Sequence, residues 1–182
     1  MNNAIGMVEM QTVASGIRTA DLMLKTSEIT LIESMPVCPG KYLILVSGDI
    51  SAVRAAVDAA VARDGEKVLG SFVLGNPHES LFPALSGTSE IDETKALGIV
   101  ETFNASAAIV AADAAAKTAM VTLIELRLAR GMCGKSFLLL TGDVAAVTAA
   151  IERAKQEAGK DAMLLDSSVI ANPDKKLWAN VL

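Results

Sequence analysis

The stretch Ala4-Ile5-Gly6-Met7-Val8-Glu9 recurs later in the chain as Ala96-Leu97-Gly98-Ile99-Val100-Glu101. Working outward from it at an offset of 92, residues 4–33 match residues 96–125 at 13 of 30 positions. The run Thr30-Leu31-Ile32-Glu33 returns intact as Thr122-Leu123-Ile124-Glu125. Self-similarity at one offset over this length indicates a duplication, so the 182 residues predict two copies of one structural unit.

Each copy predicts the order strand, helix, strand, strand, helix, strand. In the first copy we expect strands at 4–11, 30–35, 42–47 and 68–74, and helices at 13–26 and from Asp49 to Gly65, with a short helix near 80–85. Asp49, and Asp143 in the second copy, are predicted to cap the second helix through their carboxylates. The fold class is therefore α/β, with two tandem βαββαβ sandwich domains at 1–90 and 91–182.

One face of the predicted helix at 13–26 carries Val13, Ile17, Ala20 and Leu24. On the same helix Asp21 precedes Lys25 by four residues, the favourable direction for an ion pair along a helix, and Asp113 and Lys117 repeat the arrangement.

Composition excludes several classes of partner. The net charge of −5 argues against nucleic acid, whose phosphates need a basic surface. No apolar run approaches the roughly 18 residues of a membrane span, and the first residues do not resemble a secretory signal, so we expect no membrane contact and a cytoplasmic location. The mean hydropathy of +0.43 is high for a soluble protein and predicts that more of the apolar surface is buried in an oligomer.

Catalytic motifs are weak, and we expect no enzyme. Residues 129–136 end like a phosphate-binding loop, but residue 129 is alanine where that motif needs glycine, and a strand is predicted to follow instead of a helix. The single histidine, His78, is predicted to be a solvated turn residue. The carboxylates Glu9 and Glu33 recur in the second copy, which is more typical of architecture than of an active site.

Cys38 and the glycine beside it leave alternatives open. Cys38 is either a small buried residue or one of three thiolates brought together by a three-fold axis, where they could hold a [4Fe–4S] cluster. Gly40-Lys41, repeated as Gly134-Lys135, is either a tight hairpin or a loop packed around such an axis.

The repeated opening, the Ala-Asp-x-x-x-Lys helix end and the Gly-Asp before the second helix resemble the shell domains of bacterial microcompartments (BMC). Two such domains in one chain resemble the tandem-domain shell proteins, and the segment 37–41 is most similar to the T-type branch from propanediol-utilisation microcompartments. This resemblance implies a structural shell protein, a homotrimer shaped like a hexagon that meets other shell proteins edge to edge.

The same resemblance implies roles for particular residues. Cys38 is the expected metal ligand of one [4Fe–4S] cluster per trimer, and Pro39 and Gly40 are expected to shape its loop. Lys25 and Lys117 are expected at the tile edge. The implied role is electron transfer across the shell, with an encapsulated redox enzyme as a possible partner.

Three residues differ from the pattern of this family, and two alternative functions remain open. Asn76 and Asn172 stand where the family has an edge arginine, and Cys133 stands where a glycine is usual. A metal-free trimer whose central pore conducts small metabolites is the first alternative. A regulatory α/β sandwich that binds a ligand is the second.

Overall fold

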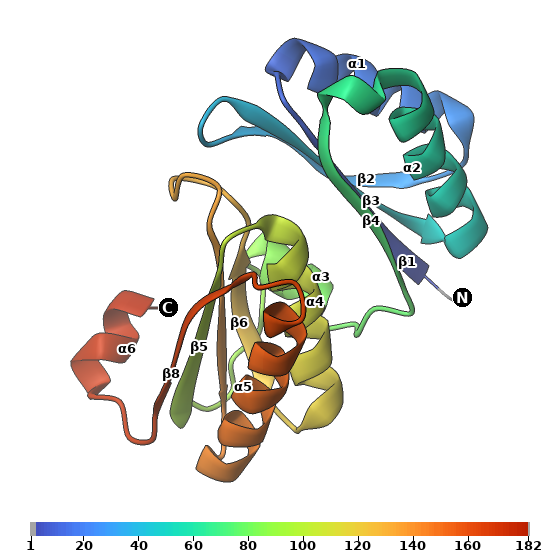
Figure 1. Ribbon diagram of the computed structural model, residues 1–182. Coiled ribbons are helices and arrows are strands. Elements are labelled where there is room, and N and C mark those ends of the chain that lie inside the picture. The colour runs from blue at the N-terminus through green and yellow to red at the C-terminus, as the bar shows by residue number, and fades with distance from the viewer. Residues whose placement is uncertain (1–2, 182) are drawn as a thin grey trace. The chain divides into compact units, whose positions relative to one another are not determined.

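Each repeat folds into one four-stranded antiparallel sheet with helices packed on it (Figure 1), which confirms the predicted α/β class. The computed structural model describes residues 3–181. The strand orders are β2-β3-β1-β4 in the first sheet and β6-β7-β5-β8 in the second. The elements are β1 (Asn3–Met10), α1 (Val13–Thr26), β2 (Thr30–Val37), β3 (Lys41–Asp49), α2 (Ile50–Asp64), η1 (Gly65–Lys67), β4 (Val68–Gly75), α3 (Leu81–Ser86), β5 (Ala96–Thr102), α4 (Ala105–Thr118), β6 (Thr122–Arg127), β7 (Ser136–Gly142), α5 (Val144–Gly159), β8 (Leu164–Ile170) and α6 (Lys175–Val181).

The chain divides into two compact units, residues 1–77 and 78–182. This division lies earlier than the predicted boundary between residues 90 and 91, which remains a proposal about the sequence repeat. The helix α3, which ends the first repeat in sequence, contacts β6 and α4 and so lies in unit 2.

The central strand of each sheet lies unusually close to a helix. A Cβ atom on Gly6 in β1 would be 2.6 Å from Val53 Cγ1 of α2. A Cβ atom on Gly98 in β5 would be 2.7 Å from Leu140 Cδ1 and 2.9 Å from Ile151 Cδ1 of α5. Because real Cβ atoms do not approach so closely, the absence of a side chain at these two positions lets the second helix rest directly on the sheet.

The buried face of α1 differs from the face that the sequence predicts. Of the apolar group on that face, only Ala20 is buried, while Val13, Ile17 and Leu24 are exposed. The physical reason is the aromatic ring of Tyr42 beneath the helix: a Cβ atom on Gly16 would lie 2.3 Å from it, so α1 turns the face with Gly16, which also carries the fully buried Met23, toward the sheet.

The predicted capping of α2 by Asp49 is wrong. Asp49 occupies the N-cap position with extended backbone, yet its side chain makes no capping hydrogen bond, and the same holds for Asp143 at α5. Side-chain caps occur instead on the first helix of each repeat, where Thr12 accepts from the Ser15 N–H and Asn104 accepts from the Ala107 N–H.

An ionic contact links α1 to the end of α2 in unit 1. The Asp64 carboxylate is buried, pairs with the Arg18 guanidinium and accepts a 3.0 Å hydrogen bond from the Thr19 hydroxyl. Burial by itself raises the pKa of Asp64, but the Thr19 hydroxyl and the Arg18 charge together hold the pKa below its ordinary value of 3.8.

The two faces of the second sheet are covered by different helices. The helix α5 packs on the face where Gly98 lies. On the opposite face, Trp178 of α6 packs with Leu97 of β5 and Ile124 of β6. The aromatic ring therefore anchors the C-terminal helix to the sheet of unit 2.

We predict that Gly6→Val lowers the free energy of unfolding by about 1–3 kcal/mol, because the new side chain must displace α2 from β1. Chemical denaturation followed by far-UV circular dichroism measures this change. Gly70→Val in β4 is the matched control, since a Cβ atom there meets nothing within 4 Å. Equal losses in both variants would contradict the close-approach argument.

We predict that Asp64→Asn destabilises the chain by about 1–2 kcal/mol at pH 7. Because the folded-state pKa is lowered, the contribution is complete above the ordinary value of 3.8 and is lost as the pH falls through the lowered pKa. The gap between variant and wild type should therefore narrow below about pH 4 in denaturation titrations. Glu152→Gln, which breaks the exposed pair with Lys155, should change stability by less than about 1 kcal/mol at every pH.

Candidate functional site

The cysteine singled out from the sequence lies at the tip of a tight hairpin between β2 and β3. The backbone N–H of Gly40 donates to the Val37 carbonyl over 3.0 Å, and Gly40 has a φ of +88°. This confirms the hairpin interpretation of Gly40-Lys41. Cys38 is half-buried, whereas Pro39 and Gly40 are exposed. The peptide bond between Cys38 and Pro39 is cis.

Side chains at the base of this hairpin hold it in place. The Lys41 ammonium lies 3.2 Å from Glu9 Oε1 on the central strand, and the Glu9 side chain is mostly buried. The Tyr42 hydroxyl hydrogen-bonds with the Ser34 hydroxyl over 3.0 Å. The repeated carboxylate Glu9 therefore has an architectural role, which supports the sequence interpretation.

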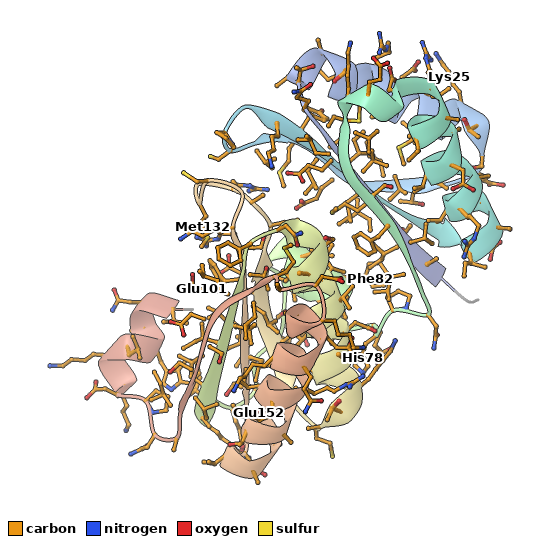
Figure 2. The ribbon with its side chains drawn as sticks, viewed as in Figure 1. Lys25, His78, Phe82, Glu101, Met132 and Glu152 are labelled. Atoms are coloured by element: carbon orange, nitrogen blue, oxygen red, sulfur yellow. The ribbon has the colours of Figure 1, made fainter. Side chains whose placement is uncertain are left out.

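The matching loop of the second repeat, residues 128–135, is built differently. Its first part folds inward: Leu128 and Ala129 are buried, and the Ala129 N–H donates to the Ser136 hydroxyl over 3.0 Å. Its tip is a turn in which the Lys135 N–H donates to the Met132 carbonyl over 3.1 Å. Figure 2 labels Met132 on this loop. Cys133 is exposed on this tip with a φ of +53°.

The segment after this loop is the strand β7 (Ser136–Gly142). A phosphate-binding loop must instead lead into a helix whose N-terminus faces the phosphate. The structure thus confirms that residues 129–136 do not form such a loop.

Both thiols of the chain are free. Within residues 3–181 the side chains of His, Cys, Asp and Glu nowhere form a group of three that could hold a metal ion. A thiolate is the correct ligand type for an iron–sulfur cluster, but one chain provides a single thiol in each turn. The Cys38 turn therefore fits such a cluster only where turns from several chains meet.

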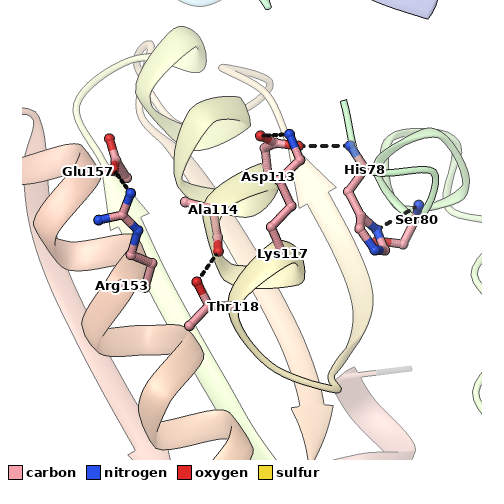
Figure 3. A network of polar contacts seen from close by, with 8 residues as sticks. All are labelled: His78, Ser80, Asp113, Ala114, Lys117, Thr118, Arg153 and Glu157. Carbon is pink, nitrogen blue, oxygen red and sulfur yellow. Dashed lines mark hydrogen bonds and ion pairs between the residues drawn. The ribbon is translucent and has the colours of Figure 1, made fainter. Parts of the chain in front are cut away.

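The lysines predicted at the tile edge both end a helix and both pair with an aspartate one turn earlier. Lys25 lies 2.7 Å from Asp21, and both side chains are well exposed. Figure 2 labels Lys25 on unit 1. Lys117 lies 2.7 Å from Asp113, whose carboxylate is buried (Figure 3). The predicted ion pairs are confirmed. The two repeats differ in the exposure of the aspartate side chain, which is high for Asp21 and low for Asp113.

His78 stands next to a turn and lines an open cleft, as a solvated turn residue would, but it also makes specific contacts. His78 is half-buried, its backbone N–H donates to Asp113 over 2.8 Å, and its ring Nδ1 hydrogen-bonds with Ser80 over 2.8 Å (Figure 3). Sequence reasoning missed this contact. The sequence did show that Asp21 recurs as Asp113, which indicates that the aspartate has the same role in both repeats. It did not show that the His78 N–H donates a hydrogen bond to Asp113.

An open cleft of about 710 Å³ lies beside this network in unit 2. Lys95 lines it and contacts Glu93 over 3.0 Å and Asp143 over 3.1 Å. The hydrogen bond to Glu93, followed by that to Asp143, raises the pKa of Lys95. The Asp143 carboxylate at the N-cap of α5 therefore pairs with Lys95 at the surface.

No described helix is long and apolar enough to cross a membrane. Two similar sheet-and-helix units, each with a structural hairpin and a helix-end lysine, define a duplicated structural protein. The sequence pattern of the BMC domain matches residues 4–77 and again residues 96–173. The chain therefore belongs to the BMC-domain family of shell proteins, as a member with two domains in tandem.

Individual relatives agree with this assignment. The chain is 38% identical, over 100% of its length and 99% of the relative's, to the bacterial microcompartment shell protein PduT of Citrobacter freundii. It is 30% identical over 86% of its length to the carboxysome assembly protein CcmO of Synechocystis, of which it covers 57%. The crystal structure of a microcompartment protein from Desulfitobacterium hafniense superimposes with a TM-score of 0.94 at 43% identity, covering 98% of this chain and 99% of that one.

This chain is accordingly a structural shell protein of a bacterial microcompartment, and its role is not enzymatic. Shell proteins of this family oligomerise and tile with other shell proteins. The expectations of a shell location and of a non-catalytic function are confirmed by family membership. The alternative of a regulatory sandwich receives no support from these relatives.

Proposed function

We propose that three copies of this chain form a pseudo-hexameric tile in which the Cys38 turns meet at the three-fold axis and hold one [4Fe–4S] cluster. The observation that carries the proposal is the hairpin tip itself. Cys38 is half-buried beside two exposed residues, Pro39 and Gly40, on a turn held firmly by the Lys41–Glu9 pair. An exposed turn that is already formed in the single chain is suited to meeting its symmetry mates, because less conformational entropy is lost when preordered groups converge.

The stoichiometry follows from symmetry. One Cys38 from each of three chains gives three thiolates, and a fourth iron would keep a non-protein ligand. When bound, such a cluster supplies one-electron transfer, and its position at the axis would place it between the two faces of the shell. The proposed role is electron transfer across the shell to an encapsulated redox enzyme.

Lateral contacts in the shell are proposed to involve Lys25 and Lys117. Both ammonium groups end a helix at the surface of their units, where a neighbouring tile could accept their hydrogen bonds. Lys25 is the more exposed of the two and pairs with an exposed aspartate, so it is the freer to exchange partners.

The central prediction concerns iron. Cys38→Ser should reduce the iron and acid-labile sulfide of anaerobically reconstituted protein to less than a tenth of the wild-type content, because serine is a poor ligand for the cluster. Cys133→Ser is the matched control and should retain both. Inductively coupled plasma analysis and the visible absorption spectrum measure the outcome.

Two results would overturn the iron proposal. Wild-type iron in Cys38→Ser would remove Cys38 from the role. A wild-type trimer that stays colourless after reconstitution would favour the metal-free tile whose pore conducts small metabolites.

A second prediction concerns tiling. Lys25→Glu should abolish the two-dimensional sheets seen by negative-stain electron microscopy while leaving the trimer mass unchanged, because it reverses charge at the proposed edge. Lys160→Glu is the control, since Lys160, the residue that follows α5, is also exposed. Sheets that form normally from Lys25→Glu would exclude Lys25 from the lateral contact.

A further inference from the structure

Two identical tetrapeptides in equivalent strands are covered to very different degrees. Thr30–Glu33 of β2 and Thr122–Glu125 of β6 have the same sequence, and both strands lie at the edge of their sheet. Leu31 is 37% exposed, whereas Leu123 is 1% exposed. Since the residues are the same, the difference arises from what packs against each strand.

The helix beside each edge strand shows the same contrast. Ile17 of α1 is 56% exposed, while its repeat counterpart Ile109 of α4 is completely buried. The Asp21 side chain is 60% exposed, while that of Asp113 is 9% exposed. Unit 1 therefore presents an open surface formed by α1 and β2, which we call the α1–β2 surface, where unit 2 is covered.

In unit 2 the cover is α3 and the residues just before it. The helix contacts both β6 and α4, and its Leu81 is completely buried. The His78 N–H, three residues earlier, donates to Asp113 (Figure 3). Thus the last helix of the first repeat covers the edge of the following sheet.

The repeat counterpart of α3 is α6, and it is only partly used within its own chain. Alignment at an offset of 96 pairs Leu81 with Leu177 and Phe82 with Trp178. Trp178 is buried on the sheet of unit 2, but Leu177 is 39% exposed. The chain therefore carries an exposed leucine on α6 and an uncovered α1–β2 surface. In unit 2 the equivalent surface, formed by α4 and β6, is the one on which α3 packs with its buried Leu81.

Charge at the two surfaces is complementary as well. The α6 helix begins with Lys175-Lys176, where the first repeat has Glu79-Ser80. The α1–β2 surface carries the exposed Asp21, and it has the exposed Glu28 where unit 2 has Met120. The two lysines and Glu28 favour attraction between α6 and this surface. Asp174, where the first repeat has His78, adds one carboxylate beside the two lysines.

We propose that α6 of a second copy of the chain packs on the α1–β2 surface, with Leu177 of one protomer against Ile17 and Leu31 of its partner. By analogy with the bond from His78 to Asp113, the Asp174 N–H of one copy donates to the Asp21 carboxylate of the next. Each protomer gives α6 and receives α6, so the contact is head-to-tail and generates a ring when the rotation closes. This inference rests on the trimer of the proposed function and identifies the surfaces that join its subunits.

The first test uses charge substitutions in the full-length chain. Leu177→Asp and Leu31→Asp should each convert the trimer to monomer in sedimentation velocity, with at least a tenfold weaker association, because each places a carboxylate in the apolar contact. Val61→Asp on α2, which is 39% exposed, is the matched control and should remain trimeric. Unchanged thermal melts of the monomers would show that folding is intact.

The second test is a covalent one that does not depend on weakening the assembly. In a Cys38→Ser/Cys133→Ser background, Leu31→Cys with Leu177→Cys should form disulfides on mild oxidation. The expected product is a covalent trimer on a denaturing gel, absent from either single variant. A bond within one chain, or no bond, would overturn the inference.

Failure of the inference is distinguishable from failure of the proposed function. A trimer that survives both leucine substitutions and yields no covalent trimer contradicts only the docking of α6. A wild-type chain that is monomeric in sedimentation contradicts the trimeric tile and, with it, this contact.

Discussion

The approach of one helix to the central strand of each sheet sets the geometry of both units. A side chain at Gly6 or Gly98 would push α2 or α5 away from the sheet, because its first carbon would lie within 3 Å of their side chains. With the helix in place, the central strand is buried on both faces and the hairpin beside it is held at the sheet edge.

The two repeats use different residues at the position where the second helix of each unit ends. Unit 1 joins α1 to α2 through the buried Asp64 with Arg18, whereas the repeat counterpart of Asp64 is Ala158, which is also buried. Such an exchange of a buried ionic contact for an apolar one is often close to neutral for stability. The two halves therefore keep one fold while their buried contacts differ.

The proposed cluster site and the proposed subunit contact share one principle: each is incomplete in a single chain. A lone thiol cannot hold a cluster, and α6 leaves Leu177 exposed while the α1–β2 surface stays open. Both become complete when identical chains meet head to tail. Assembly would thus create the metal site, so that loading with iron and closure of the ring are expected to favour each other.

The amino-acid sequence by itself determined the duplication, the order of the strands and helices and the ion pairs of Lys25 and Lys117, because these depend on local periodicity and on residues close in the chain. For Gly40-Lys41 it left two interpretations open, and the structure shows the hairpin. Tertiary structure decided which face of α1 is buried, since the ring of Tyr42 comes from another strand. It also decided that Asp143 pairs with Lys95 and that the His78 N–H donates to Asp113. Contacts between residues far apart in the chain have no periodic signal, so only the folded arrangement reveals them.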